Sequence, residues 1–503
     1  MAERMPKHRA SVESGSAQPA VPQASRESGL PRRQGTASAR GTWNSEGDAG
    51  YHQPFRTEPP GTPSPKTVTS RLEWIASQAR EYPQGTFTTL AHHLDEALLE
   101  RAFWSLNPRS SPGIDRRTWR DYRGDLATHL EDLHARLVGG TYRPQVVVRR
   151  WIPKSPGKFR PLGIPALEDK IVQAAVALLL AQIYEQDFYD FSYGFRRGRS
   201  CHDALHAARQ GMLWGIGWVI DCDVKAFFDN LGHDQLLTFL RKRIKDGRIL
   251  ALIEMWPGTD RRLVAGIMDG KDLVFPEKGS PQGSAISPLL ANVYLHEVLD
   301  TWFEEVVKAH CDGKVVMYRY ADDFVIGCEL QSDAEKIMRA LPKRFAKYGL
   351  QINEEKTRLV DFRRPRWGFD PQRDGPKPET FTFLGFTIYW GKTWKGGYTI
   401  KRKTETKRMI RTVRNIWQWC RDHRHEPLEE QYAILCAKLR GHYQYYGVRC
   451  NSRCMEWVLD RVKRAWRYWL NRRGGRKKLS WSTLERLLAA FRLPAPKIMQ
   501  PSV

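Results

Sequence analysis

The most constraining feature of this sequence is a pair of adjacent carboxylates, Asp322 and Asp323, between two apolar runs. Residues 315–320 (VVMYRY) precede Ala321 and the pair, and residues 324–328 (FVIGC) follow it. β-Branched and aromatic runs around a few polar residues predict two strands joined by a tight turn. Neighbouring carboxylates repel each other, so the turn is suited to a divalent cation such as Mg²⁺. Without further support, an exposed hairpin that binds no metal would explain the pattern better.

That support comes from a second carboxylate segment at residues 218–230 (WVIDCDVKAFFDN). It begins like a buried strand. Asp221 and Asp223 alternate with apolar residues, so the two carboxylates share one face of that strand. Phe227, Phe228 and Asp229 close the segment, and Phe227 is expected to be a core residue. We expect Asp221 and Asp229 to be structural.

Together the two segments resemble the palm of reverse transcriptases, which carries the motifs D-V-K-x-F-F-D and Y-A-D-D. The resemblance implies that Asp223, Asp322 and Asp323 are catalytic and that these residues, with Val224, hold two Mg²⁺ ions. One ion would activate the primer 3′-hydroxyl and the other would hold the triphosphate. Lys356 matches a family lysine proposed to protonate the departing pyrophosphate, which requires a lowered pKa.

Segments on both sides of residues 218–230 match the same family in order. Residues 140–165 predict a basic hairpin, with strands over 146–152 and 159–164 and a turn at 155–157. The resemblance implies four nucleotide-binding residues: Lys154, Arg160, Phe228 and Gln282. Lys154 and Arg160 would neutralise the phosphates, Gln282 of the P-Q-G turn would lie beside the nucleotide, and Phe228 would exclude ribonucleotides. The alternatives are a solvated basic hairpin and a core Phe.

Residues 107–122 and 192–205 add two weaker matches. The first resembles the loop and helix that open the fingers of group II intron reverse transcriptases. The second, SYGFRRGRSCHDAL, provides Arg196, Arg197 and Arg199 as candidate contacts to template phosphates, with no readout of base sequence implied.

The overall charge supports a polyanionic partner. The chain of 503 residues has a net charge of +25 and a pI of about 9.8, which favours nucleic acid. Its 18 Trp residues suit base stacking as well as core packing. Eight Cys without a C-x-x-C pair favour a reducing compartment and argue against a zinc ribbon. No apolar run approaches the length of a membrane span. We expect a cytoplasmic, nucleoid-associated bacterial protein with no membrane partner.

Residues 401–503 hold most of the positive charge, with 25 Lys or Arg against 8 Asp or Glu. Three helical patterns are predicted, over 407–422, 428–446 and 454–471. The stretch LRGHYQYYGV (439–448) is similar to the maturase domain of group II intron proteins, so these helices would form a thumb that grips intron RNA. The candidate nucleic-acid contacts are Arg440, His442, Arg472, Arg473, Arg476, Lys477 and Lys478. A solvated bundle is the alternative, but it would mix charge signs. No C-terminal endonuclease is expected after Met499.

The expected fold is α+β: a right-hand polymerase with fingers and an antiparallel palm sheet, followed by an α-helical thumb. The expected domains are a disordered extension (1–65), fingers with an N-terminal helical extension (66–215), a palm (216–395) and a thumb or maturase domain (396–503), with fingers and palm together spanning about 85–395. A capping box at 332–335 predicts the start of a helix that ends near Gly349. Residues 381–390 predict a pair of strands between palm and thumb.

Three functional hypotheses follow. The first is an active RNA-directed DNA polymerase of a mobile group II intron, with intron RNA, an RNA template, a DNA primer or target DNA, and deoxynucleoside triphosphates as partners. The second is an RNA-binding maturase with an inactive palm. The third is a domesticated reverse transcriptase in phage defence, CRISPR adaptation or diversity generation. The intact aspartates argue against the second, and the maturase-like C-terminus argues against the third.

Overall fold

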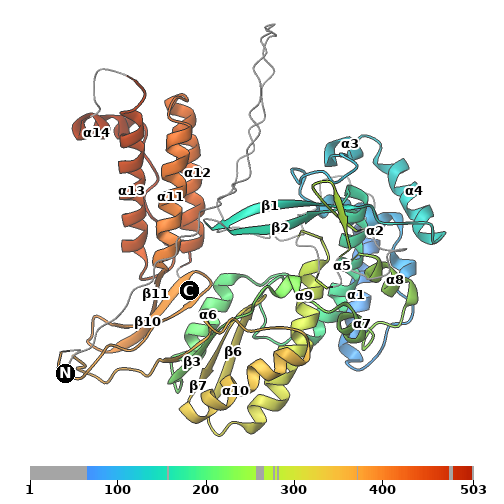
Figure 1. Cartoon of the computed structure of the whole chain (residues 1–503), viewed down its shortest axis with the longest axis horizontal. Coiled ribbons are helices and arrows are strands. Elements are labelled where there is room, and N and C mark those ends of the chain that lie inside the picture. The colour runs from blue at the N-terminus through green and yellow to red at the C-terminus, as the bar shows by residue number, and fades with distance from the viewer. Residues whose placement is uncertain are drawn as a thin grey trace, which may run out of the picture. The chain divides into compact units, whose positions relative to one another are not determined.

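The computed structural model describes residues 65–155, 158–256, 266–275, 278–279, 283–370, 372–474 and 480–500 (Figure 1). The α-helices are α1 (Pro65–Glu81), α2 (Glu96–Ser105), α3 (Trp119–Arg123), α4 (Leu126–Val138), α5 (Leu167–Asp187), α6 (Cys201–Met212), α7 (His233–Leu240), α8 (Gly247–Met255), α9 (Ser287–Leu295), α10 (Gln331–Lys347), α11 (Thr406–Asp422), α12 (Leu428–Tyr446), α13 (Ser452–Leu470) and α14 (Trp481–Ala490). The strands are β1 (Val147–Ser155), β2 (Lys158–Ile164), β3 (Trp218–Asp223), β4 (Ile267–Asp269), β5 (Asp272–Val274), β6 (Val315–Tyr320), β7 (Asp323–Cys328), β8 (Arg358–Asp361), β9 (Phe381–Phe383), β10 (Phe386–Lys392) and β11 (Tyr398–Thr404). Short 3₁₀ or π-helical segments span Ala91–His93, Phe227–Asp229, His296–Asp300, Trp302–Val307 and Lys308–His310.

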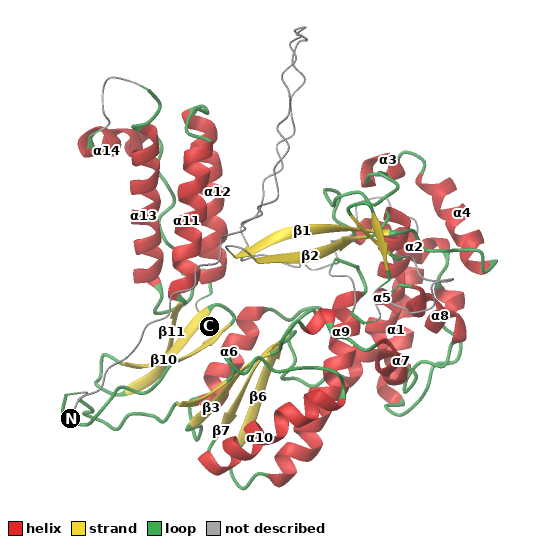
Figure 2. Ribbon diagram, in the orientation of Figure 1, coloured by secondary structure: helices red, strands yellow, loops and turns green. Residues whose placement is uncertain are grey.

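Four antiparallel strands form the central sheet, in the order β6-β7-β3-β8 (Figure 2). Side chains alternate between its two faces. Ile220 and Ile326 are fully buried in the main core, to which α10 also contributes, whereas the neighbouring Val219 and Val325 are fully buried in a second core with α6. A strand that is apolar on both faces is expected when helices or other strands cover both sides.

Helix α5 forms much of the main core, and α1 and α2 pack against it. Nearly every side chain from Leu167 to Leu180 is buried, as its apolar sequence predicts. A second sheet, in the order β2-β1-β4-β5, contains the long β1–β2 hairpin. Its β1–β4 pair is parallel, which connects segments that are more than one hundred residues apart in the sequence.

The C-terminal helices α11, α12 and α13 have a core of their own, and they run side by side (Figure 1). The three-stranded sheet β11-β10-β9 precedes them. Asn451, just before α13, ties the two parts together: its Oδ1 accepts a hydrogen bond from the Thr404 amide at 2.8 Å, and its Nδ2 donates to Thr404 Oγ1 at 2.8 Å. Tyr445 of α12 donates its hydroxyl to the carbonyl oxygen of Leu384 at 2.9 Å.

The mixture of helices and mainly antiparallel sheets confirms the predicted α+β class. The hairpin strands and the three C-terminal helices lie within a few residues of their predicted bounds. The predicted 155–157 turn falls partly outside the described residues. The capping box is wrong: α10 starts after Leu330, and Asp333 instead accepts a hydrogen bond from the Gly313 amide. No helix among the described residues is long and apolar enough to cross a membrane.

Candidate active site

The β6–β7 hairpin carries Asp322 and Asp323 at one end of the central sheet. Tyr320 pairs with Asp323 across the hairpin, so Ala321 and Asp322 alone form the turn. Ala321 has a φ of 57°, a left-handed conformation that two-residue hairpin turns use but that alanine rarely adopts. The turn therefore leaves Asp322 at the tip and makes Asp323 the first residue of β7.

Asp223 lies opposite Asp323, because the two residues are partners in the antiparallel β3–β7 register. Residues opposed in this way hold their Cβ atoms about 4.5–5.5 Å apart. Asp223 is also the last residue of β3, so its side chain lies at the same end of the sheet as the turn. The structure thus brings together the three aspartates that the sequence predicts as one set.

One oxygen of Asp223 already has two polar partners. Lys356 Nζ lies 2.9 Å from Asp223 Oδ2, and Asn353 Nδ2 donates to the same oxygen at 3.1 Å. The Asn353 amide also donates to the Asp223 carbonyl oxygen at 2.8 Å. The Lys356 and Asp223 side chains are 62% and 44% exposed, so this ion pair is weakly held and can exchange partners. Sequence reasoning missed Asn353, whose position three residues before Lys356 was the available signal.

The carboxyl of Asp323 is electrostatically unfavourable as an anion. Burial raises its pKa to about 7, with further contributions from the negative charges of Asp322, Asp221 and Asp223. The Leu384 amide, which donates to Asp323 Oδ2 at 3.3 Å, acts in the opposite direction. A carboxylate crowded by like charges is stabilised by a bound cation.

Asp221 shares a face of β3 with Asp223 but has different partners. Arg358 Nη2 lies 3.4 Å from Asp221 Oδ2, and the Thr382 amide donates to the same oxygen at 3.5 Å. Burial raises the pKa of Asp221, and Arg358 opposes that rise. Asp221 therefore links β3 to β8 and β9, which agrees with the structural role expected for it.

These residues fit a divalent cation by their chemistry. Mg²⁺ prefers carboxylate oxygens and takes its remaining ligands from water and substrate phosphates. Within the described ranges, no three His, Cys, Asp or Glu side chains already form a metal-binding cluster. Lys356 Nζ lies 2.9 Å from Asp223 Oδ2, an oxygen that a metal would otherwise use. Val224, also included in the predicted metal site, is buried next to Asp223.

The predicted nucleotide-binding residues are only partly described. Arg160 lies on β2, exposed, opposite Ile152 of β1. Phe228 is partly exposed, and its ring contacts that of Phe227, a core residue as predicted, at 5.3 Å between centroids. The side chain of Lys154 and the whole of Gln282 lie outside the described residues.

Gln173, which sequence reasoning missed, anchors the segment after the P-Q-G turn. Its Oε1 accepts hydrogen bonds from Ser284 Oγ at 2.8 Å and from the Ala285 amide at 3.1 Å. A Cβ on Gly283 would lie 2.4 Å from the carbonyl oxygen of Gly163 in β2, so only glycine allows this approach. The signal for Gln173 was an amide in the apolar run of α5, since buried amides require partners.

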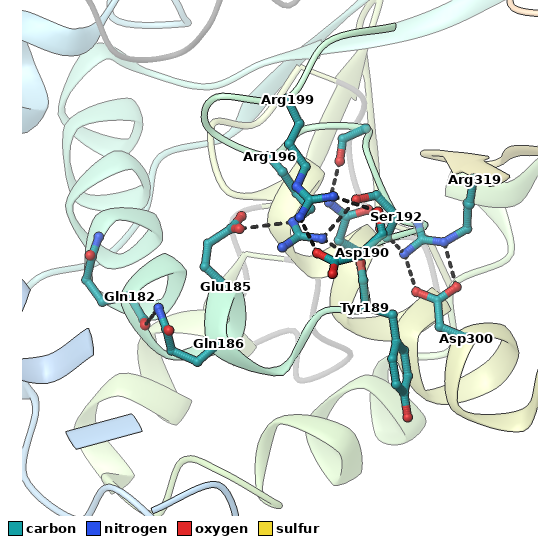
Figure 3. Close-up of polar contacts among 12 residues, drawn as sticks. Gln182, Glu185, Gln186, Tyr189, Asp190, Ser192, Arg196, Arg199, Asp300 and Arg319 are labelled. Carbon is teal, nitrogen blue, oxygen red and sulfur yellow. Dashed lines mark hydrogen bonds and ion pairs between the residues drawn. The ribbon is translucent and has the colours of Figure 1, made fainter. Parts of the chain in front are cut away.

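Arg196 and Arg199 are held by the protein itself (Figure 3). Arg196 is buried, and it bonds Glu185 at 2.9 Å and the carbonyl oxygens of Tyr189 and Ser192. This burial contradicts the expected phosphate contact of Arg196, which instead fixes the loop before it. Arg199 pairs with Asp190 at 2.6 Å, whereas Arg197 is exposed.

The predicted C-terminal contacts also differ in exposure. Arg440 and Arg472 are exposed, and the Arg472 guanidinium lies 3.5 Å from the ring centroid of Tyr468. Arg473 is partly exposed and donates to the carbonyl oxygens of Arg424 and Glu426. His442 is 8% exposed, and burial lowers its pKa to about 4, which contradicts the expected nucleic-acid contact. Arg476, Lys477 and Lys478 lie outside the described residues.

Comparison with known proteins gives this geometry a context. Residues 152–388 match the family model described as "Reverse transcriptase (RNA-dependent DNA polymerase)", a range that includes all three aspartates and Lys356. Members of this family generally use divalent metal ions.

Three relatives illustrate the range of similarity. Protein YkfC of Escherichia coli is 35% identical over 300 residues, covering 52% of this chain and 76% of YkfC. The group II intron-encoded protein LtrA of Lactococcus lactis is 42% identical over 236 residues, covering 46% of this chain and 38% of LtrA. Nuclear intron maturase 1, mitochondrial, of Arabidopsis thaliana is 31% identical over 197 residues, covering 39% of this chain and 26% of that protein. The chain belongs to the reverse transcriptase family, with group II intron-encoded proteins and maturases among its relatives.

Proposed function

We propose that this protein is an RNA-directed DNA polymerase encoded by a group II intron, and that it also binds the intron RNA to assist splicing and mobility. One observation carries the polymerase part: Asp223 opposes Asp323 at the end of a sheet whose adjoining turn holds Asp322. The sheet would be the palm, the β1–β2 hairpin part of the fingers, and α11–α13 the thumb.

Two Mg²⁺ ions, when bound, would lower the pKa of the primer 3′-hydroxyl and neutralise the triphosphate. Asp223, Asp322 and Asp323 would hold them. Lys356 Nζ lies 2.9 Å from Asp223 Oδ2, so its ammonium is at the same end of the sheet as the aspartates, where it would donate a proton to pyrophosphate. Exposed Arg160 would contact the triphosphate, and Phe228 would lie against the sugar. Lys154 and Gln282 remain proposed on resemblance.

The splicing part rests on the C-terminal helices and on the relatives. Residues 401–503 contribute 25 basic side chains, and exposed Arg440 and Arg472 lie on or just after helices with their own core. Charges spread over a rigid surface suit the phosphates of a structured RNA. We propose intron RNA, an RNA template and a DNA primer or target as partners, deoxynucleoside triphosphates as substrates, and a nucleoid-associated location.

The test is primer extension on an RNA template, with splicing of the surrounding intron measured on the same preparation. Both activities are expected, with extension dependent on Mg²⁺. Splicing without extension would identify a maturase with an inactive palm. Extension without any effect on splicing, or on binding of the intron RNA, would overturn the intron assignment.

A further inference from the structure

Arg319, two residues before the turn, is a charged side chain with no exposed surface. It lies in β6 and forms a double ion pair with Asp300, with Nε 2.7 Å from Oδ1. The same guanidinium donates to Ser192 Oγ at 2.7 Å. Arginine suits such a position because its planar group presents five donors in a fixed geometry.

The Arg319 guanidinium also reaches the turn. Its Nη1 donates to the carbonyl oxygen of Ala321 at 3.1 Å and to Asn292 Oδ1 at 3.0 Å. Ala321 is the residue with the left-handed φ, so this bond holds the peptide that leads directly into Asp322. No solvent competes for the bond, because Arg319 and Asp300 are both fully buried.

A second contact fixes the turn from its other side. The Asn292 side chain, which accepts from Arg319, donates its Nδ2 to the carbonyl oxygen of Gly194 at 2.7 Å. A Cβ on Gly194 would lie 2.2 Å from the Ala321 amide nitrogen. The loop that contains Gly194 is joined to β6 by two backbone bonds, from Tyr193 N to the Arg319 carbonyl at 2.8 Å and from Arg319 N to the Phe191 carbonyl at 2.9 Å.

We infer that Arg319 is a positioning residue for nucleotidyl transfer: with Asp300, Ser192, Asn292 and Gly194 it fixes the Ala321 peptide and so places Asp322 for metal binding. This inference rests on the proposed polymerase function. It explains why a buried ion pair lies here, since burying two charges costs desolvation energy that apolar side chains of similar volume would avoid.

The alternative is that Arg319 stabilises the fold and nothing more. Arg243 provides a matched control, because it is a second buried arginine with an ion pair and several carbonyl partners. Its Nε lies 3.0 Å from Asp187 Oδ2, and its Nη1 donates to the carbonyl oxygens of Tyr82, Pro83 and Gly85. None of these partners belongs to the central sheet or its turn.

The experiment compares Arg319→Lys, Gly194→Ala and Arg243→Lys in the full-length protein. Lysine keeps the charge opposite Asp300 but cannot reproduce the fork of donors, and Gly194→Ala displaces the turn while leaving Arg319 intact. For both variants we expect kcat to fall by about 100-fold, as for a displacement near 1 Å. The half-activating Mg²⁺ concentration should rise, with little change in KM for the template–primer. Arg243→Lys should lower the melting temperature and leave all three quantities unchanged.

Hydrogen exchange of the peptide that spans residues 315–328 supplies a readout independent of activity. Exchange should be faster in Arg319→Lys and unchanged in Arg243→Lys. Normal kcat, Mg²⁺ requirement and exchange in a folded Arg319→Lys or Gly194→Ala protein would overturn the inference while leaving the polymerase function standing. A wild-type protein that extends no primer would instead remove the proposed function, and the exchange measurement would still decide whether Arg319 holds the turn.

Discussion

The carboxylate end of the central sheet and the C-terminal helices carry charge of opposite sign in different arrangements. At the sheet, three aspartates are gathered at fixed positions, and burial raises the pKa of Asp323 to about 7. In the C-terminal residues 401–503, 25 basic side chains are spread over more than one hundred positions, and several of them are exposed. The metal binding proposed for the aspartates depends on the exact position of each charge. The RNA binding proposed for the basic residues depends mainly on the number of charges.

Mutations in the two regions should therefore differ in the size of their effect on activity. Where function depends on position, substituting one residue should abolish activity, whereas substituting a nearby residue with other partners should leave activity unchanged. Where function depends on accumulated charge, each residue contributes a small increment, since each phosphate contact adds one counterion to the salt dependence.

Asp322→Ala or Asp323→Ala should abolish primer extension and leave binding of intron RNA unchanged, because the role proposed for these carboxylates is to hold the metal ions and not to contact the template. Asp221→Asn is the matched control, since Asp221 lies on the same strand face as Asp223 but binds Arg358 and the Thr382 amide. It should retain extension. If either alanine variant kept more than about a tenth of wild-type extension, the metal assignment would be wrong.

Phe228→Ala should increase incorporation of ribonucleotides relative to deoxyribonucleotides by about 10- to 200-fold, the range of one steric pocket contact. Phe227→Leu tests the neighbouring ring, which is 2% exposed, and should change stability but not sugar selection. The measurement is single-nucleotide extension with each substrate. Unchanged selectivity in a folded Phe228→Ala protein would return Phe228 to a packing role.

His442 should make the C-terminal helices sensitive to acid. Its pKa is about 4 in the folded protein, below the ordinary value of 6.5, so the unfolded chain binds the proton more tightly. Stability is therefore complete above pH 6.5 and is lost as the pH falls toward 4, by about 2 kcal/mol between pH 7 and 5. Urea unfolding at both pH values, for wild type and His442→Gln, measures the difference. His296, whose pKa burial also lowers to about 4, is the matching site in the main core.

Arg440→Gln should weaken intron RNA binding only a few-fold and lower the salt slope by about one unit, as expected for one phosphate contact. Arg339→Gln is the control, because Arg339 is an exposed arginine on α10; its slope should stay at the wild-type value. Filter binding across a salt series distinguishes the two. Equal slopes for Arg440→Gln and wild type would mean that Arg440 lies on a solvated surface.

Local sequence patterns predicted the hairpin, because strand alternation and a two-residue turn are properties of short segments. They also predicted α11–α13, whose apolar positions recur with helical spacing. The grouping of Asp223 with the hairpin aspartates was predicted from the resemblance to reverse transcriptases. Sequence patterns did not predict helix α14 or strand β11. The sequence of β11 is as basic as its surroundings, and this strand depends on pairing with β10.

Long-range partners account for most of the errors. Arg196 has the sequence context of a phosphate ligand, but it is buried. Its guanidinium donates to Glu185 and to two backbone carbonyl oxygens. His442 lies two residues after Arg440 in the maturase-like motif, yet its neighbours exclude solvent. Arg319 is the converse case: a charge inside an apolar strand requires a partner, and nothing local identifies Asp300 or Asn292 as that partner. The fold decides which charges face water.

The backbone of Leu384 links the carboxylate end of the central sheet to the C-terminal helices. Its amide donates to Asp323, and its carbonyl oxygen accepts from Tyr445 of α12. A helix that belongs to the basic region is thus one residue away from a carboxylate of the candidate active site. A displacement of α12 would therefore alter the position of Leu384 and with it the hydrogen bond that its amide donates to Asp323. If Asp323 holds a metal ion and α12 contacts RNA, as proposed above, thermodynamic linkage requires each event to change the affinity of the other by the same factor.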